Sequence, residues 1–203
     1  MYIPSFNSFI DRQEAISFMQ RYSFATIVTS VNSIPEATHL PFLVKQQNEK
    51  LFLLSHFAKA NPQSAQIIDN TSLVIFTEPH AYISPKHYEK EENVPTWNYI
   101  AIHAYGKVVI IEEESKKAEL LQHTIAFYDA GYMQQWEKLS DHYKSKMMKG
   151  IVAFEIEVTD LQAKKKLSQN RSDTEQQNII NSLRQSADSN EKEIAAYMAK
   201  LKH

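Results

Sequence analysis

The residues best suited to chemistry lie in one short stretch, where an apolar run gives way to a polar turn. Leu51 to Leu54 form the apolar run, and its length and composition are typical of a buried strand. Asn61 and Pro62 then predict a helix over 62–69, because asparagine is a favoured N-cap and proline at the first helical position loses no needed hydrogen bond. Between strand and helix lie Ser55, His56 and Lys59. A hydroxyl, a lysine and the free N–H groups of a helix N-terminus suit a phosphate or another anion, and the alternative is an ordinary turn with one solvated lysine.

Four segments of the chain together resemble one protein family. The segment Ser-His-Phe-Ala-Lys-Ala-Asn-Pro at 55–62 resembles the most characteristic motif of the FMN-binding negative transcriptional regulators, the PaiB family. Three further segments match in the same order: Ala-Thr-His-Leu-Pro-Phe at 37–42, Val-Pro-Thr-Trp-Asn-Tyr at 94–99 and Lys-Leu-Ser-Gln-Asn-Arg at 166–171. The resemblance implies a split β-barrel of the flavin-reductase type, FMN held at a homodimer interface, and negative regulation of transcription.

The same resemblance implies which residues contact the cofactor. The phosphate and ribityl end would be held by Ser55, His56, Lys59 and Asn61. The ring would be lined by Thr38, His39 and Leu40, through side chains and edge-strand backbone. The remaining contacts would be Trp97 and Asn98, which cover or hydrogen-bond the cofactor, and Gln169 and Asn170, which approach from the far side or from the second subunit.

Each of these roles has a structural alternative. Tryptophan is more often a core or interface anchor than a flavin contact, so Trp97 fits either role. His39 is equally consistent with a hydrogen-bonded structural histidine. Gln169 and Asn170 are equally consistent with loop amides that satisfy the local backbone.

The glycine and cysteine content excludes several common kinds of site. The only glycines are Gly106, Gly131 and Gly150, whereas a Rossmann turn or a P-loop needs several glycines close together. Any phosphate must therefore be held by side chains and a helix end. The chain has no cysteine, which fits a reducing compartment. We find no signal-peptide pattern at residues 1–14 and no long apolar run, so we expect a cytoplasmic protein.

The histidines invite a metal or haem interpretation. The chain has 8 histidines, but no pair has the helical spacing of a His-Glu-x-x-His motif, and without cysteine a structural zinc site is improbable. We therefore expect no metal site. Haem stays open as an alternative to FMN, because related split barrels can use this scaffold for haem, with a histidine as axial ligand.

Apolar patterning predicts an α+β fold. Strands are expected over 24–30, 36–44, 51–54, 73–77, 97–111 and 151–158, and helices over 11–22, 112–130, 134–148, 173–185 and 189–202. Pro41 cannot donate to a strand ladder, so its strand should lie at an edge or carry a bulge. Together with the resemblance, this pattern predicts an FMN-binding split β-barrel with inserted helices over 1–172. A C-terminal helical pair over 173–203 should pack on that barrel.

Charge gives only weak support for DNA binding. The net charge of −2 exerts no general attraction for nucleic acid. Lys164, Lys165 and Lys166, together with Arg171, form a short basic run that we expect to be a solvated surface, with DNA contact a weaker possibility. No general base or nucleophile can be assembled from the sequence, so any catalysis would be carried by the flavin. A flavin-dependent oxidoreductase with indirect regulatory effects is therefore the alternative to a homodimeric regulator.

Overall fold

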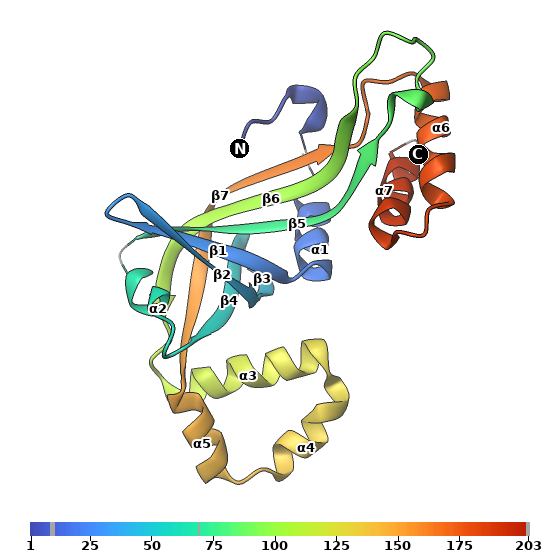
Figure 1. Cartoon of the computed structure of the whole chain (residues 1–203). Coiled ribbons are helices and arrows are strands. Elements are labelled where there is room, and N and C mark those ends of the chain that lie inside the picture. Colours follow the sequence, from blue (N-terminus) through green and yellow to red (C-terminus); the bar gives the residue numbers. More distant parts are fainter. Residues whose placement is uncertain (9–10, 69, 202–203) are drawn as a thin grey trace. The chain divides into compact units, whose positions relative to one another are not determined.

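A computed structural model describes residues 1–8, 11–68 and 70–201 of the chain (Figure 1). Its seven strands form one sheet in the order β2-β1-β5-β6-β7-β4-β3. The strands are β1 (Phe24–Val31), β2 (Ile34–Pro41), β3 (Leu43–Gln47), β4 (Lys50–Ala58), β5 (Thr71–Ile83), β6 (Thr96–Ile110) and β7 (Ile151–Lys166). The mixed α+β character agrees with the prediction.

The two outermost strands of this sheet are consecutive in sequence. β2 and β3 stand at opposite ends of the strand order, yet only Phe42 separates them along the chain. Because consecutive Cα atoms lie about 3.8 Å apart, the two edges must come together, and the sheet curves into a split barrel. The prediction of one strand over 36–44 is therefore wrong, since the chain leaves one edge at Pro41 and enters the other at Leu43. The predicted edge position of the Pro41 strand is confirmed.

Four phenylalanines fill the core where the edges meet. Phe42, Phe57, Phe76 and Phe154 are fully buried. The Phe42 ring lies 5.9 Å from that of Phe76 and 6.2 Å from that of Phe154, and the Phe57 and Phe154 rings are stacked at 5.1 Å. Burying such a side chain contributes about 1.5–3 kcal/mol. The packing of Phe42 thus fixes the point where the chain passes from β2 to β3.

Gly106 is required by the close approach of two strands. A Cβ atom at this position of β6 would lie 2.2 Å from the Glu157 carbonyl oxygen and 2.5 Å from an Ile156 side-chain carbon. We predicted a bend or bulge here, and the structure gives glycine a different reason, which is room for the β7 backbone.

The described residues fall into two compact units. One unit comprises 16–76 and 103–161, and the other comprises 1–15, 77–102 and 162–203. The strands β5, β6 and β7 contribute residues to both units. The predicted domain boundary at residue 172 stays a prediction.

The first unit contains most of the inserted helices. These are α2 (Gln63–Gln66), α3 (Glu114–Tyr128), α4 (Met133–Lys138) and α5 (Asp141–Lys149), with a 3-10 turn at Ala130–Tyr132. The single helix predicted over 134–148 is wrong, because the chain is extended at Leu139 and Ser140 and the Ser140 hydroxyl accepts from Tyr143 N at 3.2 Å. That serine begins a new helix as its N-cap.

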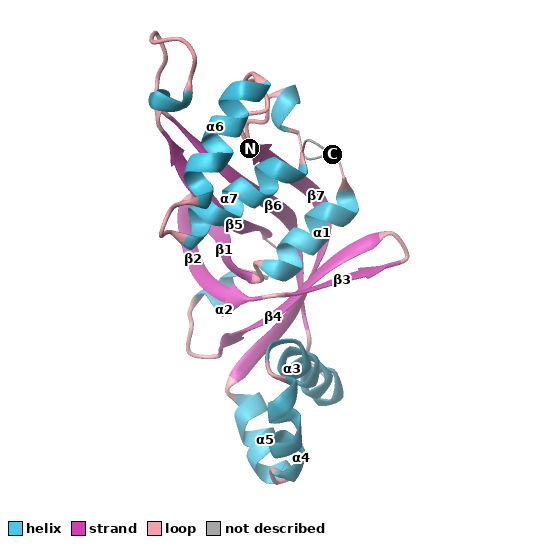
Figure 2. Cartoon of the chain, turned by 90° about the vertical axis from the view of Figure 1, so that its right-hand side faces the viewer, coloured by secondary structure: helices cyan, strands magenta, loops and turns pink. Residues whose placement is uncertain are grey.

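The second unit contains the C-terminal helical pair. α6 (Asp173–Arg184) and α7 (Ser189–Lys200) lie side by side in Figure 2 and contact each other. Their apolar residues Ile179, Ile180, Leu183, Ile194 and Met198 are buried, whereas Leu201, just after α7, is 42% exposed. Short 3-10 turns occur at Ser5–Asn7 and Pro85–His87. α1 spans Arg12–Arg21, and the carboxylate of Asp11 just before it accepts from Gln13 N and Glu14 N.

Candidate functional site

The strand before the turn that carries Lys59 is longer than predicted. Ser55 and His56 lie within β4, opposite Phe154 and Ala153 of β7, so placing them in the turn was wrong. The apolar run ends at Leu54, but backbone pairing with β7 carries the strand on to Ala58. The Ser55 hydroxyl is buried and donates to the Pro41 carbonyl oxygen at 2.6 Å. In the isolated chain it therefore ties β4 to the end of β2.

The turn itself carries Lys59 and leads into a very short helix. α2 spans Gln63–Gln66, so the predicted helix over 62–69 is too long. Asn70 Nδ2 donates to the Gln66 carbonyl oxygen at 2.9 Å and takes an acceptor that a longer helix would use, while residue 69 lies outside the described residues. A single turn has a small dipole, because the dipole is a sum over aligned peptide units. The exposed side chain of Lys59 is thus the group of this turn best suited to an anion.

Thr38 and Asn61, two predicted contacts, are joined by hydrogen bonds. Asn61 Nδ2 donates to Thr38 Oγ1 at 3.0 Å, and the Thr38 hydroxyl donates to Gln63 Oε1 at 2.5 Å. Asn61 Oδ1 also accepts from Gln63 N at 2.9 Å. The edge strand β2 is thereby fixed to the turn that carries Lys59. The prediction of Asn61 as N-cap is wrong by one residue, since α2 begins at Gln63 and its N-cap is Pro62.

Gln63 is the centre of this arrangement, and the sequence analysis missed it. Its side chain is buried, and Nε2 lies 3.1 Å from Thr29 Oγ1, 3.2 Å from the Glu36 carbonyl oxygen and 3.3 Å from the Ile27 carbonyl oxygen. A buried amide must satisfy its polar atoms, and Gln63 does so with β1 and β2. Its place directly after Asn61-Pro62 was the only signal in the sequence.

The two residues that follow Thr38 have different environments. Leu40 is buried and belongs to the core. His39 is exposed, and its ring lies 6.3 Å from the exposed ring of Phe24 at an interplanar angle of 26°. The edge strand β2 and its neighbour β1 therefore together present a flat aromatic pair to solvent. In β4 the His56 side chain is half-buried, and burial lowers the pKa of its imidazole, which favours the neutral ring.

The predicted contacts of the second unit begin with Trp97 and Asn98, which point to opposite faces of β6. Trp97 is 51% exposed, and its ring lies 5.8 Å from that of His80 and 5.9 Å from that of Tyr82. Asn98 is fully buried. Its Oδ1 accepts from Ser168 Oγ at 3.0 Å, and its Nδ2 lies 3.5 Å from the Met198 sulfur. Trp97 is thus available to a ligand or a partner, whereas Asn98 ties β6 to its own unit.

The turn at 168–171 is held by the side chain of Gln169, which is bonded to the adjacent backbone. Gln169 Oε1 accepts from Leu167 N and Gln169 Nε2 donates to the Lys165 carbonyl oxygen, both at 2.7 Å. In this chain Gln169 therefore has the local role that was the alternative to cofactor binding. Arg171 Nη1 donates to Asn93 Oδ1 at 2.8 Å, and its guanidinium carbon lies 3.8 Å from the centre of the Tyr88 ring.

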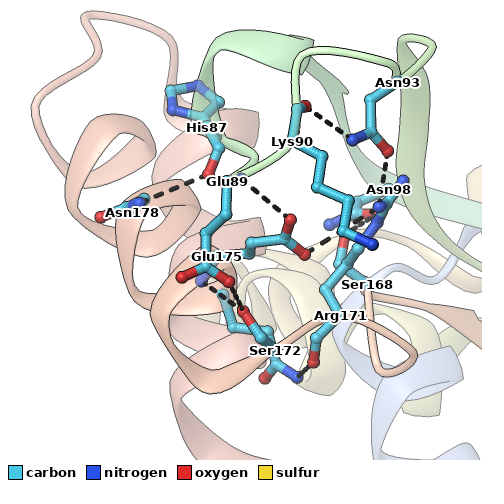
Figure 3. Close-up of polar contacts among 11 residues, drawn as sticks. His87, Glu89, Lys90, Asn93, Asn98, Ser168, Arg171, Ser172, Glu175 and Asn178 are labelled. Atoms are coloured by element: carbon cyan, nitrogen blue, oxygen red, sulfur yellow. Dashed lines mark hydrogen bonds and ion pairs between the residues drawn. The ribbon is translucent and has the colours of Figure 1, made fainter.

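Figure 3 shows that this turn belongs to a larger polar network of the second unit. The Ser172 hydroxyl donates to Glu89 Oε2 at 2.9 Å, and Glu89 N donates to Glu175 Oε1 at 3.1 Å. Asn178 Nδ2 lies 3.4 Å from the His87 carbonyl oxygen. α6 is therefore bonded to the segment 85–95, which connects β5 to β6.

A cavity of about 400 Å³ opens beside this turn, within the second unit. Asn98 and Asn170, two predicted contacts, line it together with Tyr99, Lys164, Lys166 and Arg171. The basic run is therefore not the solvated surface that we expected, since Lys164 and Lys165 are buried. The Lys165 ammonium pairs with Glu14, whereas those of Lys164 and Lys166 contact the Tyr2 carbonyl oxygen and the Thr96 hydroxyl.

A larger cavity of about 520 Å³ lies in the first unit, next to α3. It is lined by acidic and basic side chains that include Glu112, Glu155 and Lys45. The Lys45 ammonium lies 3.2 Å from His123 Nδ1. None of the predicted cofactor contacts lines this cavity, so size alone does not identify the flavin site.

The structure thus gathers the predicted contacts into two sets. Thr38, His39, Leu40, Ser55, His56, Lys59 and Asn61 lie in the first unit, and Trp97, Asn98, Gln169 and Asn170 lie in the second. Within residues 1–8, 11–68 and 70–201, no three metal-binding side chains are placed to hold an ion. In the same described ranges, no helix has the length and apolar character needed to cross a membrane.

Comparison with solved structures supports the fold. The flavocytochrome Anf3 of Azotobacter vinelandii has a TM-score of 0.59 at 14% identity, covering 76% of this chain and 67% of that one. An FAD- and haem-binding protein of Mycobacterium smegmatis has a TM-score of 0.58 at 13% identity, covering 77% and 71%. At these identities the likeness concerns the fold, and it agrees with the predicted split barrel.

Comparison at the level of sequence identifies the family. Residues 1–160 match the family described as "Putative FMN-binding domain". The protease synthase and sporulation protein PAI 2 of Bacillus subtilis is 40% identical over 203 residues, which is 98% of this chain and 96% of that protein. An uncharacterised protein of Emericella nidulans is 31% identical, covering 71% of this chain and 73% of its own length. The chain therefore belongs to the PaiB-type FMN-binding domain family, as the order of its four motifs predicted.

Proposed function

We propose that this chain is a homodimeric FMN-binding protein of the PaiB type that acts in the cytoplasm as a negative regulator of transcription. The observation that carries the cofactor part is the hydrogen-bonded set of Thr38, Asn61 and Gln63, which fixes the edge strand β2 beside the exposed Lys59. An edge strand at a fixed distance from a cation is an arrangement suited to a flat ring with an anionic tail.

The residues of the first unit fit FMN chemically. Lys59 would pair with the phosphate, because a solvated ammonium loses little in exchanging water for a dianion. Thr38 and the β2 backbone would offer hydrogen-bonding groups to the ring edge, and the exposed ring of His39 would offer it a flat surface. When bound, the flavin supplies the capacity for electron transfer. The half-buried, neutral His56 would add a donor and an acceptor without a second positive charge.

Dimerisation is supported by the family and by exposed aromatic side chains. Phe24 is 69% exposed and Trp97 is 51% exposed, and large aromatic side chains of this kind are enriched at protein interfaces. In the dimer that we propose, Trp97 and Asn170 contribute to the cofactor site. Light scattering of the purified chain with and without FMN tests this, and a monomer in both conditions would contradict it.

The cofactor is tested by spectroscopy and titration. We expect the purified chain to show flavin absorption or to bind added FMN with quenching of its fluorescence. Lys59→Ala should weaken FMN binding by about 1–3 kcal/mol, the size of a charge-assisted contact. Lys138→Ala removes an exposed lysine of α4 in the same unit and is the matched control. Equal affinities for the wild type and Lys59→Ala would remove Lys59 from the site.

The regulatory part rests on the family resemblance and on similarity to PAI 2. It is tested by recovering sheared genomic DNA with the tagged, FMN-loaded chain at about 100–150 mM salt, where non-specific phosphate contacts are weakened. Enrichment of a promoter fragment, followed by repression of a reporter from that promoter, is the expected result. Recovery that is uniform across the genome would argue against direct repression.

A further inference from the structure

We propose that the cavity beside β6 and β7 in the second unit, bounded by Lys164, Lys166 and Arg171, binds a small organic oxyanion, a carboxylate or phosphate ester carried on a planar apolar body. This goes beyond FMN binding and would be a second ligand site. The cavity shares Asn98 and Asn170 with the predicted cofactor contacts, so the experiment below is built to separate the two ligands.

The lining of the cavity is positively charged. The cavity is lined by three cationic side chains and no carboxylate, although Arg171 Nη1 lies 3.9 Å from Glu175 Oε2 behind the lining. Lys164 is only 8% exposed, and Lys166 and Arg171 are half-buried. Among the residues that the structure describes, neither Lys164 nor Lys166 pairs with a carboxylate, whereas the adjacent Lys165 pairs with Glu14. Burying an ammonium without an opposite charge costs several kcal/mol, and an anion entering the cavity would offset that cost.

The contacts of these lysines stabilise their charge without neutralising it. The Lys164 ammonium lies 3.2 Å from the Tyr2 carbonyl oxygen and 5.2 Å from the centre of the Tyr99 ring. A carbonyl dipole and an aromatic face attract a cation, yet the net charge of the cavity stays positive. Burial lowers the pKa of Lys166, the facing Tyr99 raises it and Lys164 lowers it, and the net shift is downward.

The shape and lining of the cavity indicate the rest of the ligand. Its volume of about 400 Å³ is within the usual range for small-molecule sites. The rings of Tyr2 and Tyr99 border it, and they provide apolar faces against which a flat body can stack. Asn170 is exposed at the rim and offers an amide for orientation. An aromatic or similarly planar oxyanion satisfies all three features, whereas a bare inorganic ion would leave the apolar lining unused.

The experiment uses the full chain and titration calorimetry with phenyl phosphate, benzoate and inorganic phosphate as probes. We expect phenyl phosphate or benzoate to bind more tightly than inorganic phosphate, and the preferred one to identify the oxyanion. Lys166→Met should weaken that binding at least about tenfold, the loss expected when a charge-assisted contact is removed. Lys166→Arg should restore it. Lys192→Met, at an exposed position of α7 in the same unit, is the matched control.

The same titrations are repeated on the FMN-saturated chain. Continued binding of the probe supports a separate site, and loss of FMN binding in Lys59→Ala with the probe unaffected strengthens that result. Should Lys166→Met fail to fold, Arg171→Gln supplies the second test. The proposal is overturned if no probe binds at millimolar concentration, or if Lys166→Met binds as the wild type does. It is also overturned if FMN excludes the probe and Lys166→Met loses both ligands. A chain that binds the probe but never FMN would contradict the proposed function alone.

Discussion

Two regions of this molecule could hold an anion, and they are built in opposite ways. The turn after β4 presents one exposed lysine, Lys59, next to a neutral set of buried hydrogen bonds centred on Gln63. The cavity beside β6 and β7 presents three cations, one of them the buried Lys164, and no acid. The first region is pre-organised by uncharged groups. The second is pre-organised by charges, of which Arg171 is paired with Glu175 and those of Lys164 and Lys166 are not paired with a carboxylate of the described residues.

The difference shows how a ligand can be inferred from energetics. An exposed lysine costs almost nothing to keep, so its presence alone says little about a ligand. A buried ammonium without a carboxylate is costly, so its presence requires compensation. The Lys59 region therefore depends on the family for its assignment, whereas the cavity depends on the structure. Mutations that act on the hydrogen bonds or on the charges test this distinction directly.

The largest effect should come from the neutral hydrogen bonds. Gln63→Ala would leave the Thr29 hydroxyl and the Ile27 and Glu36 carbonyl oxygens with one partner fewer. Buried polar groups without partners cost about 1–3 kcal/mol each, so we expect the free energy of unfolding to fall by about 3 kcal/mol. Urea denaturation measures it, and FMN affinity should fall as well because Thr38 loses its acceptor.

Gln66→Ala is the control for that experiment. Gln66 lies in the same helix turn and donates to the Glu36 carboxylate at 3.0 Å, but it is only half-buried. We expect it to cost less than about 1 kcal/mol. Equal losses for the two variants would mean that Gln63 has no special role in holding β2 to the turn.

A smaller effect, of opposite sign, should come from the buried cation. Lys164→Met replaces the ammonium with an apolar chain of similar length, and the ligand-free protein should become more stable by about 1 kcal/mol or more, because the desolvation cost disappears. Binding of phenyl phosphate should be lost in the same variant. Lys59→Met should change stability by less than about 0.5 kcal/mol. A destabilised Lys164→Met would mean that its contacts with Tyr2 and Tyr99 outweigh the cost of burial.

Anion binding in the cavity should also depend on pH. Burial and Lys164 lower the pKa of Lys166, while the facing Tyr99 raises it, and the net shift is downward. An ammonium is charged below its pKa, so affinity for phenyl phosphate should be full near neutral pH. It should fall as pH rises through a range below the ordinary lysine value of about 10.4. In Lys166→Arg the decline should be weaker, because Arg171 and the new arginine stay charged. Calorimetry at stepped pH measures the difference.

Features set by interactions between residues close in sequence were predicted well, and features set by distant residues were not. β1, β6, α6 and α7 were predicted nearly to their ends, because their apolar spacing and caps are local. The split at Phe42 was not predicted, since a residue that ends one strand and precedes another has no distinct local pattern. Ser55 and His56 were placed in a turn because the apolar run stops before them, although pairing with β7 extends the strand.

The charged residues show the same limit more sharply. Three consecutive lysines indicate a solvated surface by composition alone. Their burial depends on partners far away in sequence, Glu14 for Lys165 and Tyr2 for Lys164. No local window contains those partners. The motif that contains Lys59, by contrast, could be recognised because the residues that resemble the family are close together in the chain.

The smallest predicted effect concerns His56, which is half-buried beside the exposed turn. Burial lowers its pKa below the ordinary value of 6.5, so the unfolded chain takes up a proton at a higher pH than the folded chain does. The contribution of His56 to stability is therefore complete above pH 6.5 and is lost as pH falls through its folded pKa. His56→Gln should flatten this part of the stability curve, whereas His142→Gln, at an exposed position of α5, should leave it unchanged. If the FMN phosphate binds beside His56, protonation of the ring adds a cation next to the phosphate. FMN affinity should then strengthen as pH falls through this range in the wild type, relative to His56→Gln. That difference would place the histidine in the cofactor region and leave the cationic cavity unaffected.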